Sequence, residues 1–205
     1  ICLIIDVSAK KKAEKMRREF TANVTHELKT PLTSISGYAE IIASGLVKPD
    51  DIPNFANKIH KESGRLLSLI SDIMELSQLD EKFSDEEFAP VDLAGVAAEV
   101  AEDLRSNAEK HGITITVDTK TAVINGNRNQ IYELIYNLCD NAIRYNRENG
   151  SVKIITGDDN EHPFVKVADT GIGIAPEEQG KVFERFYRVD KSRSKARGGT
   201  GLGLA

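Results

Sequence analysis

Apolar positions in the first part of the chain recur every three or four residues, which predicts two long amphipathic helices. The first runs from residue 10 to about 46, and a turn with two prolines at residues 48–53 separates it from the second. One helical hairpin cannot cover its own apolar stripe, so we expect two copies to pair into a four-helix bundle. The predicted stripes are Phe20, Val24, Leu28, Leu32 and Ile35, then Phe55, Ile59, Leu66, Leu69, Ile73, Leu76 and Leu79.

The pattern changes after residues 80–90, an acidic stretch that is typical of a linker. Residues 91–112 predict a short extended piece followed by a helix, and residues 127–146 predict another helix. Residues 113–117, 151–156 and 164–168 are β-branched or alternating, which predicts three strands, with an Asp-Asp-Asn turn between the last two. The predicted fold class is therefore α+β: a helical hairpin forming a dimeric bundle, followed by an α/β sandwich. Residues from 171 onward are rich in Gly, Lys and Arg and predict a lid over a ligand.

Composition narrows the function classes. The net charge of −5 argues against a nucleic-acid binder, so we expect no nucleic-acid partner. Continuous apolar runs are shorter than the roughly 20 residues that cross a bilayer. Residues 1–7 are mostly apolar and lack an initiating Met, and we interpret them as the end of an upstream sensor domain or linker. Cys139 lies in an apolar helical pattern, which predicts a reduced core thiol.

His26 stands in the most informative segment of the first helix. Glu27 follows it directly, so that a carboxylate can take a proton from one imidazole nitrogen while the other attacks an electrophile. Thr30 lies one turn further along the same face. Pro31 has no N–H to donate, so we expect the helix to bend there. The alternative is that His26 is an ordinary polar residue on a solvated helix face.

Asn137, Asn141 and Tyr145 lie four residues apart, on a stripe beside the apolar face of their helix. Amide oxygens suit Mg²⁺, which keeps bound waters and shares phosphate oxygens. The phenol ring of Tyr145 suits a base that must be covered. The alternative is a solvated helix face with ordinary polar residues.

Two glycine segments frame the predicted lid. Asp169 ends a strand, and as an acceptor-only carboxylate it suits an exocyclic amino group such as that of adenine. The glycines that follow it let the backbone turn sharply beside a ligand. Closely spaced glycines at residues 198–203 expose backbone N–H groups to phosphate, and Arg185 or Arg188 can face the γ-phosphate. The alternatives are a plain strand turn and, at residues 191–197, a disordered basic linker.

Taken together and in this order, the segments resemble the H, N, G1, F and G2 boxes of sensor histidine kinases of two-component systems, in particular the PhoR/WalK-like cytoplasmic region. The resemblance extends from about residue 10 to the end of the chain. It implies a HisKA-type dimerisation and phosphotransfer domain at residues 8–87. It also implies a Bergerat-type ATP-binding domain, shared with gyrase and MutL ATPases, at residues 88–205. In the family that domain continues into a helix and a strand, so we expect the pattern to go on past residue 205.

The resemblance also implies an activity and partners. The γ-phosphoryl group of Mg²⁺–ATP would pass to the chain and then to an aspartate of a response regulator receiver domain, with phosphatase activity as well. The kinase would be a homodimer. It would be the cytoplasmic region of a bacterial inner-membrane sensor protein, reaching the membrane only through segments absent from this chain.

Residue roles follow by position in the family's motifs. His26 is implied as the phospho-acceptor, Glu27 as its acid/base partner, and Thr30 as a helper in dephosphorylation. Asn141 is implied to hold Mg²⁺ and Asp169 to bind adenine. The remaining implied site residues are Asn137, Arg144, Tyr145, Gly171, Gly173, Arg188, Gly199, Gly201 and Gly203.

Two other functions remain open. A Bergerat-fold ATPase without kinase activity would share the nucleotide motifs, and the segment around His26 argues against it. A non-catalytic dimeric scaffold would dock a partner without chemistry. The presence of His26, Asn141 and Asp169 together argues against that second alternative.

Overall fold

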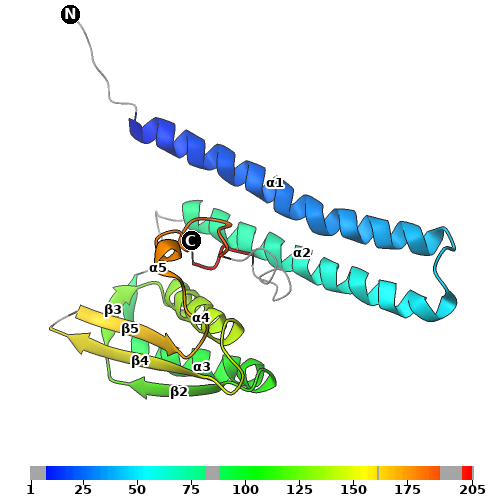
Figure 1. Cartoon of the computed structure of the whole chain (residues 1–205). Helices are drawn as coiled ribbons and strands as arrows, with labels where there is room; N and C mark the ends of the chain where they lie inside the picture. The colour runs from blue at the N-terminus through cyan, green and yellow to red at the C-terminus, as the bar shows by residue number, and fades with distance from the viewer. Residues whose placement is uncertain (1–7, 82–87, 161, 190–199, 205) are drawn as a thin grey trace, which may run out of the picture. The chain divides into compact units, whose positions relative to one another are not determined.

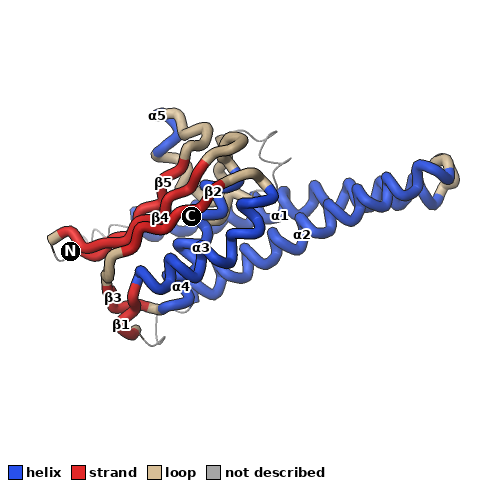
Figure 2. Tube along the Cα trace, turned by 90° about the horizontal axis from the view of Figure 1, so that it is seen from below, coloured by secondary structure: helices blue, strands red, loops and turns tan. Residues whose placement is uncertain are grey.

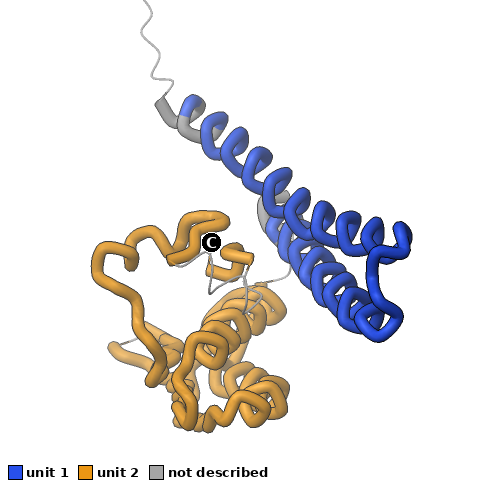
Figure 3. The backbone as a smooth tube through the Cα atoms, turned by 45° about the vertical axis from the view of Figure 1, so that its right-hand side comes forward, with its two compact units in different colours: residues 1–77 blue, residues 78–205 orange. Residues whose placement is uncertain are grey.

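The computed structural model of the chain describes residues 8–81, 88–160, 162–189 and 200–204. The expectations for residues 1–7, for the basic linker at 191–197 and for Gly199 lie outside these residues. The chain forms two compact units, residues 1–77 and 78–205 (Figure 3).

The first unit is a hairpin of two long antiparallel helices, as predicted (Figure 1). Helix α1 spans Ser8–Ala43 and α2 spans Ile52–Glu81, with a single 3₁₀ turn, η1, at Pro49–Asp51 between them. Helix α1 ends where Gly45 adopts a positive φ of 70°, which only glycine takes without strain. Pro31 lies inside α1 and is fully buried, and the helix continues past it.

Aromatic and charged side chains join the two helices of the hairpin. The rings of Tyr38 and Phe55 meet edge to face with centroids 5.8 Å apart. The Lys58 ammonium lies over both rings, 5.5 Å and 5.1 Å from their centroids. These contacts hold the helices together at the end of the hairpin that carries the turn.

Part of the apolar stripe that we expected a second copy to cover is already buried within the single chain. Leu69 and Leu76 are already buried in the single chain. Leu32, on the predicted stripe of the first helix, is 58% exposed, which agrees with a face that one hairpin leaves uncovered. The helical period shows that a face is apolar but not which surface covers it. The exposed apolar residues of this region include Leu32, Leu67, Ile70 and Met74.

The second unit is a layer of two helices on one face of a three-stranded sheet (Figure 2). Its sheet has the order β2-β4-β5, in which β2 is parallel to β4 and β4 is antiparallel to β5. Strands β1 and β3 form a separate antiparallel pair. The elements are β1 (Ala89–Asp92), α3 (Leu93–Lys110), β2 (Thr114–Thr119), β3 (Val123–Gly126), α4 (Arg128–Arg144), β4 (Ser151–Asp159), β5 (His162–Asp169) and α5 (Pro176–Gln179).

Capping side chains fix where the two helices of this unit begin. The Asp92 carboxylate accepts from the backbone N–H of Ala94 at the start of α3. The Asn127 amide oxygen accepts from the N–H groups of Asn129 and Gln130 at the start of α4. The start of α4 agrees with the prediction to within one residue, whereas the strand β3 was not predicted.

The core of the second unit lies between α3, α4 and the sheet. Cys139 is buried there, as predicted, and burial raises the pKa of its thiol to about 12, with the nearby Asp140 charge adding to the effect. On the surface of the sheet, Lys153 pairs with Asp118 at 2.8 Å. The largest fully buried core side chains include Val96, Val100, Leu104, Ile135, Val152 and Ile154. Among the described residues, no helix is both long enough and apolar enough to cross a membrane.

Candidate functional site

His26 projects from α1 into solvent, with its side chain 77% exposed. Its Nδ1 atom lies 3.7 Å from Oε1 of Glu27, slightly beyond hydrogen-bond distance. An imidazole in this position is accessible to a reactant carried by another domain or molecule. The nitrogen nearer the carboxylate is Nδ1, so Nε2 is the one left to attack.

Glu27 is far less exposed than His26, because it faces α2. Its side chain is 20% exposed, and Oε2 lies 3.4 Å from Nη2 of Arg65, which donates a hydrogen bond to it. Nη1 of the same arginine lies 4.0 Å from a carboxylate oxygen of Glu62. Sequence reasoning missed Arg65, because the contact joins residues 38 positions apart.

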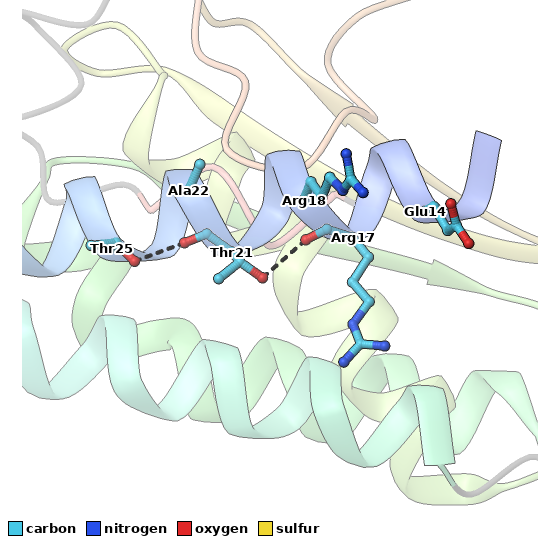
Figure 4. A pocket seen from close by; sticks show the side chains of 6 residues that line it. All are labelled: Glu14, Arg17, Arg18, Thr21, Ala22 and Thr25. Carbon is cyan, nitrogen blue, oxygen red and sulfur yellow. Dashed lines mark hydrogen bonds between the residues drawn. The ribbon is translucent and has the colours of Figure 1, made fainter. Parts of the chain in front are cut away.

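Thr30 lies one turn after His26, as predicted, and its hydroxyl donates to the His26 carbonyl oxygen at 3.1 Å. Two preceding threonines make the same bond to the carbonyl four residues back: Thr25 to Thr21 at 2.9 Å, and Thr21 to Arg17 at 3.0 Å (Figure 4). The expected bend at Pro31 stays a prediction.

A hollow lies along α1 in the turns before His26, as the close view shows (Figure 4). Two exposed arginines, Arg17 and Arg18, are among the residues that line it. Positive charge therefore lies about two helical turns before the histidine. The side chains that line the hollow are those of Glu14, Arg17, Arg18, Thr21, Ala22 and Thr25.

In the second unit, Asn137 and Asn141 are half-buried on α4. Asn137 touches the second glycine segment: a Cβ atom on Gly203 would lie 3.4 Å from its Oδ1. The structure therefore brings together two motifs that are far apart in the sequence. Arg144, by contrast, forms an ion pair at 2.7 Å with Asp140, one turn earlier on the same helix.

Tyr145 joins the end of α4 to the loop after β5. Its carbonyl oxygen accepts from the N–H of Ile172 at 3.1 Å. Oδ1 of Asp169 accepts from the N–H of Gly171 at 2.7 Å, which closes a tight turn. A Cβ on Gly171 would lie 2.6 Å from the Tyr145 oxygen and 2.7 Å from Asp169 Oδ1, so only glycine fits. Gly173 has a positive φ of 71°.

A buried polar network behind this turn was not anticipated from the sequence. Asn146 is 8% exposed, and its Nδ2 donates to the Ser151 carbonyl oxygen at 3.1 Å. The Thr170 hydroxyl donates to Asn146 Oδ1 at 3.1 Å and accepts from the Ser151 N–H at 2.9 Å. The network ties the end of α4, the start of β4 and the end of β5 together, and so fixes the residue next to Asp169.

The second glycine segment packs against residues 186 and 187. Gly201 has a φ of 77°, and its carbonyl oxygen accepts from the N–H of Phe186 at 2.7 Å. A Cβ on Gly201 would lie 2.9 Å from the Tyr187 carbonyl oxygen. Arg188 is half-buried in the same segment, and Leu202, next to Gly201, is buried. Gly201 therefore packs against Phe186 and Tyr187, directly before Arg188.

The donor set limits how a cation can bind. Among the described residues, no three His, Cys, Asp or Glu side chains gather closely enough to hold a metal ion by themselves. A divalent cation would therefore take oxygens from an amide such as that of Asn141 and from the ligand it accompanies. Mg²⁺ binds in this way with phosphates, so the residues present fit it.

Two family models match the chain in the order of its two units. Residues 16–82 match the His Kinase A (phospho-acceptor) domain. Residues 126–205 match the histidine kinase-, DNA gyrase B-, and HSP90-like ATPase family.

Curated relatives match over the whole chain. It is 39% identical over 206 residues to the sensor-like histidine kinase SenX3 of Mycolicibacterium smegmatis, covering 100% of this chain and 54% of that protein. It is 35% identical over 209 residues to the sensor histidine kinase WalK of Bacillus subtilis, covering 100% of this chain and 34% of that protein. The chain thus spans between a third and about half of the length of these two relatives.

Solved structures share the fold. The histidine kinase ThkA, in complex with the response regulator protein TrrA, matches with a TM-score of 0.68 and 27% identity, covering 92% of this chain and 57% of that chain. The histidine kinase AdeS of Acinetobacter baumannii matches with a TM-score of 0.67 and 25% identity, covering 87% of this chain and 83% of that chain.

Proposed function

Because this chain belongs to the sensor histidine kinase family, we propose that it transfers the γ-phosphoryl group of ATP to His26 and then to an aspartate of a response regulator. The observation that carries the proposal is the exposed imidazole of His26 beside a carboxylate that is anchored from the opposite helix. The nucleotide motifs assembled in the second unit supply the complementary half of the reaction.

The first step is an in-line displacement at phosphorus. Nε2 of His26 forms the new N–P bond while the bond from phosphorus to the β,γ-bridging oxygen breaks, and ADP leaves with that electron pair. Glu27 accepts the proton of Nδ1, the ring nitrogen that lies 3.7 Å from its carboxylate. The exposure of His26 suits a nucleophile that must reach a nucleotide held by another domain.

The second unit holds the nucleotide in this proposal. Asp169 accepts a hydrogen bond from the adenine amino group, and Gly171 and Gly173 let the backbone pass close to the base. When bound, Mg²⁺ supplies positive charge shared between the phosphate oxygens and the Asn141 amide, with Asn137 beside it. The backbone N–H groups at the second glycine segment and the Arg188 guanidinium face the phosphates. The residues of that segment in this role are Gly199, Gly201 and Gly203.

Phosphoryl transfer to a regulator and dephosphorylation of that regulator use the same exposed face of α1. The phosphoryl group moves from Nε2 to a carboxylate of a receiver domain as the N–P bond breaks, and Glu27 returns the proton to Nδ1, which restores the neutral imidazole. Thr30 assists removal of phosphate from the regulator, since a hydroxyl that donates to a carbonyl can still accept from a water. The solved complex of ThkA with its response regulator TrrA supports this class of partner.

The kinase works as a homodimer in this proposal. A row of apolar side chains is exposed along the hairpin, and a second copy would cover it in a four-helix bundle. The row comprises Leu32, Leu67, Ile70 and Met74.

Labelling with γ-labelled ATP tests the function and separates it from its rivals. A phosphohistidine gives protein-bound label that is lost in acid and stable in alkali, which is the expected result. Release of labelled phosphate without any protein label would instead favour a plain ATPase. Absence of both, in a protein that still forms dimers, would favour a scaffold.

A further inference from the structure

We propose that Arg65 is a positioning residue for phosphorylation of His26, acting through Glu27. The inference rests on the proposed function and adds to it a residue on the opposite helix of the hairpin. The ion pairs of Arg65 with Glu27 and Glu62 keep its guanidinium at the carboxylate rather than at the imidazole. Its role is to fix the carboxylate that receives the imidazole proton.

The geometry forms a chain of contacts from α2 to the imidazole. Nη2 of Arg65 lies 3.4 Å from Oε2 of Glu27, and the other oxygen of that carboxylate lies 3.7 Å from Nδ1 of His26. Arg65 thus occupies one oxygen of Glu27 and leaves the other directed at the ring. Loss of this contact would remove the ion pair that holds Oε2 of Glu27 at Arg65.

Arg65 and Glu27 are much less exposed to solvent than the nucleophile His26. The side chains of Arg65 and Glu27 are 15% and 20% exposed, whereas that of His26 is 77% exposed. Ion pairs shielded from water hold their geometry better than exposed pairs, which contribute little. Glu62, whose side chain is 28% exposed, lies 4.0 Å from the second guanidinium nitrogen and steadies the arginine from its own helix. The fork shape of a guanidinium suits two carboxylates at once, which an ammonium group does not.

The kinetic test compares Arg65→Ala, Arg65→Lys and Glu27→Gln with the double variant. General-base catalysis contributes roughly 10²–10⁴-fold to rates, so loss of its positioning should lower the autophosphorylation kcat about tenfold or more in Arg65→Ala. The KM for ATP should stay unchanged, since the nucleotide binds in the other unit. Arg65→Lys should retain part of the kcat that Arg65→Ala loses. The double variant, Arg65→Ala with Glu27→Gln, should be no slower than Glu27→Gln alone, because both substitutions act on the same proton acceptor.

NMR spectroscopy tests the role of Arg65 without relying on kinase activity. Ring-nitrogen NMR shifts of His26, recorded at about pH 8, where an ordinary imidazole is neutral, report which nitrogen carries the proton. Arg65→Ala should move them in the same direction as Glu27→Gln. Arg105→Ala, which removes an exposed arginine paired with Glu102 in the second unit, should leave them unchanged and serves as the matched control.

The two readouts separate failure of this inference from failure of the proposed function. Wild-type protein without any phosphohistidine would refute the function, and the NMR shifts would still decide the role of Arg65. Ring shifts and kcat in Arg65→Ala that match the wild-type protein would overturn the positioning role. An effect of Arg65→Ala on kcat that adds in full to that of Glu27→Gln would also overturn it. Thermal unfolding of each variant shows whether the hairpin remains folded.

Discussion

Gly171 is the position in the nucleotide site where a single added methyl group should do most damage. A Cβ atom there would lie 2.6 Å from the Tyr145 carbonyl oxygen and 2.7 Å from Oδ1 of Asp169. Ordinary carbon–oxygen contacts are no closer than about 3.3 Å, so the backbone must shift by several tenths of an ångström. Gly171→Ala therefore has to move the turn that carries Asp169.

The cost follows from the contacts that the shift disturbs. Forcing a methyl group into a packed site costs about 1–3 kcal/mol. The displaced turn also strains the Gly171 N–H bond to Asp169, at 2.7 Å, and the Ile172 N–H bond to Tyr145, at 3.1 Å. Each such bond contributes about 1 kcal/mol. Since about 1.4 kcal/mol changes an equilibrium constant tenfold, we expect ATP affinity to fall by at least about tenfold.

Calorimetric titration with ATP measures this loss directly. Gly180→Ala is the matched control, because Gly180 lies in the same region with an ordinary φ of −72°, and a Cβ atom there would meet none of the described residues within 4 Å. The control should bind ATP like the wild-type protein. Wild-type affinity in Gly171→Ala, with the fold intact by circular dichroism, would refute the reasoning about this turn.

Four further predictions concern separate features. Asp169→Asn puts a donor where an acceptor is required and should weaken ATP binding by about 1–3 kcal/mol in calorimetry; near-wild-type affinity would rule out adenine recognition. Thr30→Ala should keep the labelling of His26 and slow dephosphorylation of the regulator, whereas a wild-type rate would leave Thr30 only a helix residue. Leu67→Asp should turn a dimer into a monomer in light scattering, and an unchanged mass would contradict the bundle. Cys139, whose burial raises the thiol pKa to about 12, should react with thiol reagents at about pH 8 only after unfolding; rapid labelling of the native protein would contradict its packing.

Local pattern was sufficient to predict the four long helices and the fold class, but not the short helix α5. The 3.6-residue period extends over both long helices, and α3 and α4 carry clear apolar stripes with polar caps. Strand β3, only four residues long, was missed because so short a run gives no readable alternation. The turn expected over Asp158, Asp159 and Asn160 is confirmed only at Asn160, which has a φ of 53°, because Asp158 and Asp159 still pair within the β4–β5 ladder.

Contacts between distant residues were beyond the reach of the sequence. The bond from Arg65 to Glu27 and the buried network of Asn146 with Thr170 depend on which elements pack together. The same limit applies to the apolar stripes of the hairpin, since periodicity cannot tell a face covered by its own chain from one left for a second copy. Charged and amide side chains carry no periodic signal that would reveal their partners.

Labelling of His26 itself is the most direct test of the central claim. His26→Gln and His60→Gln are incubated with γ-labelled ATP beside the wild-type protein, and ATP binding is titrated in parallel; His60 is an exposed histidine on α2 and serves as the matched control. We expect His26→Gln to lose all acid-labile label while keeping wild-type affinity for ATP, and His60→Gln to label normally. Acid-labile label that persists in His26→Gln would contradict the assignment of His26 as the phosphoryl acceptor.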